Sequence, residues 1–281
     1  MSVSAQIDSH LRRLTPAERR VAAVVADDPE AVAFGTVADV ARRAGTSGAS
    51  VVRLATKLGF DGFVELQGSV REELARRLRP ASERIRRPAA GDVLGTALAV
   101  EMGNVAATLE GVDRAAFDEA VHLLCRRGAS RVLVLSGDAS SGVATLFTGE
   151  LSMLRPGVAA VEGSPVRVAR LLADTGPSDM VVVIDLARYD GAVLDAAGRA
   201  ADRGATLLAL TDSSVSPLAA MAAVTFTAAV SGAGPFDSHV GLLALANALL
   251  AGVAARLRRS ATDRLDEVEA AWRAAGALTD G

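Results

Sequence analysis

The stretch Asp39–Phe60, DVARRAGTSGASVVRLATKLGF, decides the fold of the front of the chain. Two segments with apolar residues at helical spacing flank the short polar turn Gly-Thr-Ser-Gly. Gly45 can adopt the positive φ that ends the first helix, and Ser47 can cap the second. In the second helix the expected buried stripe consists of Val51, Leu54, Ala55 and Leu58. Two short helices joined by a tight glycine turn predict a helix-turn-helix, whose second helix offers its outer face to the major groove of DNA.

The outer face of the second helix holds the candidate DNA contacts. We expect these contacts from Thr46, Ser47, Ser50, Arg53 and Lys57. Arg53 can reach a guanine edge or a phosphate, whereas Lys57, the only lysine of the chain, suits a backbone phosphate. The same pattern also fits a plain helical hairpin with a solvated basic face.

Helix signals also precede this motif. In Leu14–Glu18, LTPAE, Thr15 can cap a helix and Glu18 can close a capping box. Pro29 is expected to end this helix, and Thr36 to cap the first helix of the motif. The front of the chain therefore reads as a small all-helical domain.

The segment Leu14–Leu74 resembles the N-terminal domain of RpiR-type transcriptional regulators. The similarity rests on an L-T-x-x-E-R-x-V opening, an A-x-x-A-G-x-S turn, a V-V-R-x-x-x-K-L-G-F helix and a D-G-F-x-E-L continuation, in this order. The resemblance implies an all-α helix-turn-helix domain, placed at residues 1–77, that binds a double-stranded DNA operator.

Length and composition narrow the remaining possibilities. With 281 residues, the chain has room for one small and one ordinary domain. Aromatic residues make up 3%, too few for a row that stacks the bases of single strands. The only cysteine, Cys125, excludes an internal disulfide and a cysteine-based zinc cluster. Without a leader-like or membrane-spanning run, we expect a cytoplasmic protein with no membrane partner.

The charge is distributed unevenly along the chain. Residues 1–87 hold 15 Arg and Lys against 11 Asp and Glu, a net charge of +4, and the remainder holds 15 against 22, a net charge of −7. A basic front and an acidic back favour a polyanionic partner for the front alone. Between them, residues 78–92 contain two prolines and several arginines without apolar periodicity, and we place a linker there.

The rest of the chain, residues 93–281, alternates apolar strands with helical segments. The expected strands are residues 131–135, 158–161, 180–185, 206–212 and 224–230. The expected helices are residues 93–109, 115–124, 140–154, 165–173, 192–201 and 240–257. Apolar strands without alternation are typical of a parallel sheet covered on both faces, so the sequence predicts a doubly wound α/β domain of five strands.

Ligands of such sheets bind beyond the carboxyl ends of the strands, near helix N-termini. Three loops meet this description, and two of them are rich in serine. Ser140, Ser141, Ser213 and Ser214 could hold a phosphate or carboxylate, or they could simply cap the following helices.

This half resembles the SIS (sugar isomerase) domain that follows the helix-turn-helix in RpiR-type regulators, with ALTDSSVSPLAAMA as the clearest segment. The resemblance implies a domain that senses a small effector, usually a phosphosugar, and assembles homodimers or larger homo-oligomers. However, where sugar-phosphate-binding domains carry S-x-S-G-x-T, this chain has Asp185–Asp190, DLARYD, and retains none of the hydroxyl residues.

The changed loop alters the expected ligand. Asp185 and Asp190 add negative charge that should repel a dianionic phosphate, and Arg188 could offset it or pair with Asp185 in a vestigial site. Hexose phosphates should therefore bind weakly, and a ligand should combine an acidic group with hydroxyl or amino donors. The candidate ligand-binding residues are Ser140, Ser141, Asp185, Arg188, Ser213, Ser214 and His239.

The histidines give no sign of catalysis or of a metal site. His10, His122 and His239 lie far apart, and only His239 is placed near the expected cleft. We expect no metal, no cofactor and no enzymatic activity. The favoured function is a ligand-responsive transcriptional regulator of a metabolic operon. The alternatives are an SIS-type sugar-phosphate isomerase with a DNA-binding appendage and an architectural DNA binder with an inactive scaffold.

Overall fold

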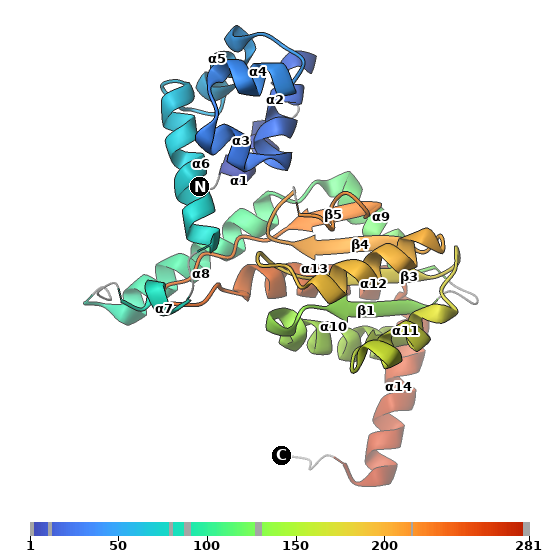
Figure 1. Ribbon diagram of the computed structural model, residues 1–281. Coiled ribbons are helices and arrows are strands. Elements are labelled where there is room, and N and C mark those ends of the chain that lie inside the picture. Colours follow the sequence, from blue (N-terminus) through green and yellow to red (C-terminus); the bar gives the residue numbers. More distant parts are fainter. Residues whose placement is uncertain are drawn as a thin grey trace. The chain divides into compact units, whose positions relative to one another are not determined.

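The computed structural model describes residues 3–10, 13–78, 81–86, 91–126, 131–214 and 216–277. The chain divides into two compact units, one formed by Met1–Gly91 with Gly234–Phe236 and the other by Asp92–Ala233 with Asp237–Gly281 (Figure 1). We call them the N-terminal and C-terminal units. Part of the expected linker 78–92, including Arg87, lies outside the described residues, and Ala81–Arg84 within it forms the one-turn helix α7.

The described part of the N-terminal unit is entirely helical. Besides α7, its helices are α1 (Val3–His10), α2 (Pro16–Asp27), α3 (Pro29–Phe34), α4 (Val37–Arg43), α5 (Gly48–Lys57) and α6 (Phe63–Leu78). A capping box begins α2 at Thr15, as the sequence predicts. Thr36 caps α4 as expected, and Asp39 completes a second capping box there that was not expected from the sequence. Gly45 has a φ of 55° and follows Ala44, the C-cap residue of α4, which allows the tight turn into α5.

The C-terminal unit contains one five-stranded parallel sheet in the order β2-β1-β3-β4-β5 (Figure 1). Its strands are β1 (Val132–Ser136), β2 (Val158–Val161), β3 (Met180–Ile184), β4 (Thr206–Thr211) and β5 (Val224–Thr227). Its helices are α8 (Val93–Glu110), α9 (Arg114–Leu124), α10 (Ser141–Leu154), α11 (Pro165–Ala173), α12 (Gly191–Asp202), α13 (Val240–Arg256) and α14 (Arg258–Ala275), with a 3-10 turn η2 (Asp138–Ser140). The expected doubly wound α/β fold is confirmed.

Each face of the sheet has its own core. Side chains of α9, α10, α13 and α14 cover one face around Phe147 and Leu249, and those of α11 and α12 cover the other around Leu172 and Ala196. Successive strand residues contribute to opposite cores, as Val181 and Val182 do. The strands are therefore buried on both sides, which explains their continuous apolar sequences.

Strand β5 ends at Thr227, three residues earlier than the sequence predicts. Beyond that point, side chains of α8 accept the backbone N–H groups that would otherwise continue the sheet. Thr108 Oγ1 accepts the N–H of Ala229 at 2.9 Å, and Asn104 Oδ1 accepts the N–H of Ser231 at 3.1 Å. Gly241 of α13 lies against the same place, where a β-carbon would approach Thr108 Oγ1 to 2.5 Å. A glycine is needed for α8 and α13 to pack this closely.

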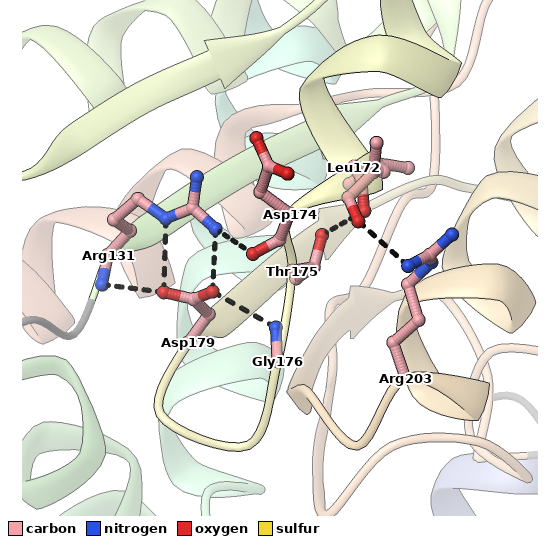
Figure 2. Close-up of polar contacts among 8 residues, drawn as sticks. Arg131, Leu172, Asp174, Thr175, Gly176, Asp179 and Arg203 are labelled. Atoms are coloured by element: carbon pink, nitrogen blue, oxygen red, sulfur yellow. Dashed lines mark hydrogen bonds and ion pairs between the residues drawn. The ribbon is translucent and has the colours of Figure 1, made fainter.

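An ion pair joins β1 and β3 at their N-terminal ends (Figure 2). The Arg131 guanidinium donates to both carboxylate oxygens of Asp179, at 3.1 and 2.7 Å, and also to the carbonyl of Asp174 at 2.6 Å. Asp179 additionally accepts the backbone N–H groups of Arg131 and Gly176. These donors, the guanidinium foremost, hold the pKa of Asp179 below its ordinary value despite its burial.

Helix α14 was not expected from the sequence. It follows α13 after a bend of 104°, and Arg264 on its side donates to the carbonyl of Ser152 in α10 at 2.8 Å. Within the described ranges, no single helix is long and apolar enough to cross a membrane. Only α13 and α14 taken together meet that test of length and composition.

Candidate nucleic-acid interface and ligand site

Helix α5 is positioned by its apolar stripe. Val51, Leu54, Ala55 and Leu58 are buried in the core of the N-terminal unit, as predicted, where α5 packs against α2 and α4. This packing determines which side chains of α5 remain outside. Ala49, Val52, Arg53, Thr56 and Lys57 are exposed.

The expected exposure of Ser50 is wrong. Its side chain is 2% exposed because it lies one turn before Leu54 and beside Val51, on the flank that faces the core. Ser50 Oγ lies 3.3 Å from Ser47 Oγ and accepts a hydrogen bond from Arg53 at 2.9 Å. Ser50 therefore holds Arg53 in place rather than facing outward itself.

Thr46 and Ser47 lie in the turn before α5. Thr46 is half-buried, and its backbone N–H donates to the carbonyl of Ala41, which closes the turn. Ser47 is exposed and occupies the expected N-cap position, but its side chain makes no capping bond and its Oγ lies 3.3 Å from Ser50 Oγ instead. Both residues adjoin the exposed face of α5, and their contact with DNA stays a prediction.

Lys57 has a structural partner that sequence reasoning missed. Its Nζ donates to Glu18 Oε2 at 2.7 Å and to the carbonyl of Arg13 at 3.4 Å. The Glu18 side chain is 2% exposed and also accepts the N–H of Thr15, so Lys57 ties α5 to the start of α2. The hydrogen bond from Lys57 lowers the pKa of Glu18 to about 2. With 40% of its side chain exposed, Lys57 can still meet a phosphate, and this contact stays a prediction.

In the C-terminal unit, Asp185 is the first residue of the loop between β3 and α12, and its side chain organises that loop. Its side chain is 4% exposed and accepts the N–H of Leu186 at 3.0 Å and that of Asp190 at 2.8 Å. Burial raises the pKa of Asp185, and these two bonds oppose the rise. The carboxylate lies against Gly137 of the loop after β1, where a β-carbon would come within 2.2 Å of Oδ1. A glycine at position 137 is therefore required by Asp185.

The same loop is joined to the end of β4. Tyr189 donates to Asp212 Oδ1 at 2.8 Å, and both its burial and the charge of Asp212 raise the pKa of the Tyr189 hydroxyl. Between Asp185 and Tyr189, Arg188 is exposed and has a φ of 72°, a left-handed conformation that is uncommon for residues other than glycine. Asp190 caps α12 through the N–H of Ala192. Neither Tyr189 nor Asp212 was a sequence candidate, although both lie in loops that the sequence singled out.

The predicted serines and His239 differ in their surroundings. Ser140 is fully buried, and within the described part of the chain its Oγ has no hydrogen-bond partner. Ser141, by contrast, donates to the carbonyl of Asp138. Ser213 is buried and Ser214 half-buried. The Nε2 atom of His239, just before α13, is buried and unpaired within the same described residues.

No group of three or more His, Cys, Asp or Glu side chains suited to a metal ion occurs in the described ranges. A cavity of about 430 Å³ lies elsewhere in the C-terminal unit, lined by His122, Cys125, Arg126, Arg256 and Leu257. Its arginine at the end of α13 contacts His122 Nδ1 at 3.0 Å. None of the candidate ligand residues lines this cavity.

Comparison with known proteins identifies both units. Residues 1–77 match the model of the helix-turn-helix domain of the rpiR family, and residues 127–252 match the SIS domain model. The crystal structure of the sugar isomerase domain of an RpiR transcription factor from Sphaerobacter thermophilus is 34% identical, with a TM-score of 0.57, over 63% of this chain and 99% of that one. The chain belongs to the RpiR family of transcriptional regulators. It combines the helix-turn-helix and SIS domains of that family.

Other similar proteins match over most of the chain. The HTH-type transcriptional regulator YbbH of Bacillus subtilis is 24% identical over 94% of this chain and 95% of its own length. HexR of Pseudomonas aeruginosa, also an HTH-type transcriptional regulator, is 28% identical over 76% of this chain and 74% of its own. The Vibrio vulnificus NanR protein, solved in complex with ManNAc-6P, is 21% identical with a TM-score of 0.58, over 96% of this chain and 98% of that one, which shows a shared fold.

Proposed function

We propose that this transcriptional regulator acts in the cytoplasm as a ligand-responsive switch of a metabolic operon. In this proposal α5 reads an operator in the major groove, and the carboxyl edge of the sheet binds a small sugar-derived effector. The observation that carries the DNA-reading part is the exposed face of α5, where Ser50 fixes the only exposed guanidinium of that helix. The complex of NanR with ManNAc-6P supports the class of effector.

The composition of the exposed α5 face determines how it would read DNA. The methyl groups of Ala49, Val52 and Thr56 suit thymine methyls, and Arg53 suits a guanine edge or a phosphate. The apolar side chain of Val52 is 43% exposed to water, so burying it against a thymine methyl would be favourable. We propose that these four residues, with Thr46, Ser47 and Lys57 at the margin, form the contact surface.

The experiment begins with an operator selected from random duplex DNA by the full-length protein. Fluorescence anisotropy then compares Arg53→Ala with wild type on the selected and on scrambled DNA. Loss of a base contact should cost about 1–3 kcal/mol on the selected site only. Arg42→Ala, which removes an exposed arginine of α4, serves as the matched control and should not change base preference. Equal losses on both DNAs would contradict base reading by Arg53.

We also propose that the regulator is a homodimer joined through α8. Leu94, Leu98 and Met102 follow one another at intervals of four residues on α8 and are 83%, 63% and 64% exposed. The only charged side chain inside that helix before its last residue is Glu101, which accepts hydrogen bonds from Ser238 and Asn104. An apolar helix face of this length is typical of an interface.

We propose that the apolar stripe of α8 packs against the same stripe of a second copy of the protein. A two-fold dimer buries the same apolar stripe on both partners, and it supplies the two helix-turn-helix units that an inverted-repeat operator requires. Sedimentation at micromolar concentration should show a dimer for wild type and a monomer for Leu98→Glu with Met102→Glu. Val166→Glu, which charges an equally exposed apolar residue of α11, should remain dimeric. A monomeric wild type would leave the stripe to another partner and contradict the proposal.

We propose no catalytic role for the SIS domain. The full-length relatives are named as transcriptional regulators, and the buried Asp185 is bonded to its own loop. A general base must reach the substrate proton, and a carboxylate with both oxygens engaged is poorly placed to do so. Nuclear magnetic resonance of fructose 6-phosphate incubated with the protein should show no aldose product. Turnover that Asp185→Asn abolishes would favour the isomerase alternative.

A further inference from the structure

The loop between β3 and α12 carries the carboxylate of Asp185 next to the N-terminus of α12, where an anionic ligand usually binds in such sheets. Asp185 is the first residue after β3, and α12 begins six residues later, at Gly191. In a parallel sheet the backbone N–H groups of such a loop point toward the ligand and attract anions. Here two of them, from Leu186 and Asp190, already donate to the Asp185 carboxylate.

Two further contacts, one with β4 and one with the loop after β1, determine the position of the Asp185 carboxylate. The backbone N–H of Asp185 donates to Leu210 of β4, which continues the sheet, and the carboxylate lies directly against Gly137 of the neighbouring loop. Any side chain at position 137 would collide with it. The Asp185 carboxylate therefore lies between the loops that follow β1 and β3, at the carboxyl edge of the sheet.

The remaining charges at this edge are mostly of the same sign. Asp138, Asp190 and Asp212 lie in the three loops that follow β1, β3 and β4, and Arg188 is the only described cation in the β3 loop. Asp190 takes the N–H of Ala192, so the first donors of α12 are also engaged by an acidic side chain. An incoming dianion would meet net negative charge and few available backbone donors.

Polar groups that point to a ligand nevertheless remain close by. Ser140 Oγ, fully buried at the end of the loop that contains Gly137, has no partner within the described residues. A buried hydroxyl without a partner is uncommon, because an unmade hydrogen bond is costly. A ligand hydroxyl or amine could complete it without bringing a negative charge.

We propose that Asp185 is a built-in anion that occupies the position of a ligand phosphate, so that this regulator recognises an uncharged or amine-bearing polyhydroxylated metabolite and rejects phosphate esters. The inference deepens the proposed function, since it concerns the ligand class of the same effector site. Asp185 is in this view a specificity-determining residue. It satisfies the loop donors that a phosphate would need, and it repels the phosphate by charge.

The test compares the full-length wild type with Asp185→Ser and Asp185→Asn by isothermal titration calorimetry at neutral pH. The probes are glucose 6-phosphate, ManNAc-6P and inorganic phosphate. Asp185→Ser removes both the charge and the two carboxylate oxygens that occupy the loop donors, so it should bind at least one probe about tenfold tighter than wild type or more. Asp185→Asn removes the charge but keeps the bulk, and should show a smaller gain of the same sign.

A second measurement covers the possibility that Asp185→Ser folds poorly. Fluorescence of Trp272, the only tryptophan, follows thermal unfolding of the C-terminal unit, and inorganic phosphate should raise the melting temperature of Asp185→Ser but not that of wild type. Tight binding of a probe by wild type would overturn the proposal, as would a folded Asp185→Ser or Asp185→Asn that gains nothing. Anisotropy with operator DNA is measured in parallel, so that a failure of DNA binding is recognised separately from a failure of phosphate exclusion.

Discussion

Replacing Lys57 by alanine separates a structural role from a DNA-binding role. The sequence places this lysine on a phosphate, whereas the structure gives its Nζ a 2.7 Å hydrogen bond to Glu18, whose side chain is 2% exposed. The variant leaves a buried carboxylate without its cation. Because Glu18 also closes the capping box of α2 with Thr15, the loss should loosen the contact between α5 and α2.

The expected magnitude follows from the exposure of the two partners. A hydrogen bond to a charged group contributes about 1.5–3 kcal/mol, and the 40% exposure of Lys57 places this one near the lower end, at about 1.5–2 kcal/mol. Lys57 holds the pKa of folded Glu18 at about 2, below its ordinary value of 4.5. This stabilisation is therefore present above pH 4.5 and is lost as the pH falls toward 2. Wild type and variant should differ most at neutral pH and converge in acid.

Urea denaturation followed by far-ultraviolet circular dichroism measures this difference. The only tryptophan and the only tyrosine, Trp272 and Tyr189, both lie in the C-terminal unit, so tryptophan fluorescence provides an internal control that should not change. Glu18→Gln should reduce the effect of Lys57→Ala when the two are combined. If Lys57→Ala unfolds at the wild-type urea concentration while the salt dependence of DNA binding falls by about one, Lys57 binds a phosphate, and a stabilising role of its bond to Glu18 is refuted.

Three further changes test the C-terminal unit. Asp179→Asn should destabilise it by about 1.5–2 kcal/mol at neutral pH, because Arg131, whose side chain is 37% exposed, loses its charged partner. The deficit in tryptophan-monitored unfolding should shrink in strong acid, where the lowered pKa of Asp179 is crossed and wild type loses the same charge. Gly137→Ala should lower the melting temperature, and combining it with Asp185→Ser should recover part of the loss, since the collision is with that carboxylate. Tyr189→Phe should cost about 1 kcal/mol through the lost bond to Asp212, and an unchanged unfolding curve would contradict that bond.

The DNA-reading helix shows how far periodicity alone leads. The buried residues of α5 follow from their spacing, and the same spacing places Ala49, Val52, Arg53 and Thr56 on the opposite side. Ser50 was predicted as a DNA contact because it is polar, but its hydroxyl is buried and accepts a hydrogen bond from Arg53. A stricter helical projection would have found the error, because position 50 lies one turn before a core leucine.

The sheet could be predicted almost completely, but its loops could not. Continuous apolar runs specify buried parallel strands, and they indicate the order of strands and helices along the chain. The resemblance to SIS domains also implies that Asp185 stands where related domains carry a hydroxyl residue. It does not show that this carboxylate turns back onto its own loop, because that depends on Gly137, which lies 48 positions earlier in the chain. Likewise, the pairing of Lys57 with Glu18 joins residues of two separate helices.

The two ends of the sheet differ in how completely their polar groups are paired. At the N-terminal ends of the strands, Arg131 and Asp179 satisfy each other and the neighbouring backbone (Figure 2). Beyond the opposite ends, Ser140 Oγ and His239 Nε2 are buried without a partner in the described residues. An unpaired buried polar group costs about 1–3 kcal/mol, so a ligand that bonds to either atom recovers free energy that the free protein has already lost. Affinity at this edge is therefore expected to depend on hydrogen bonds to these neutral atoms rather than on attraction of a ligand anion.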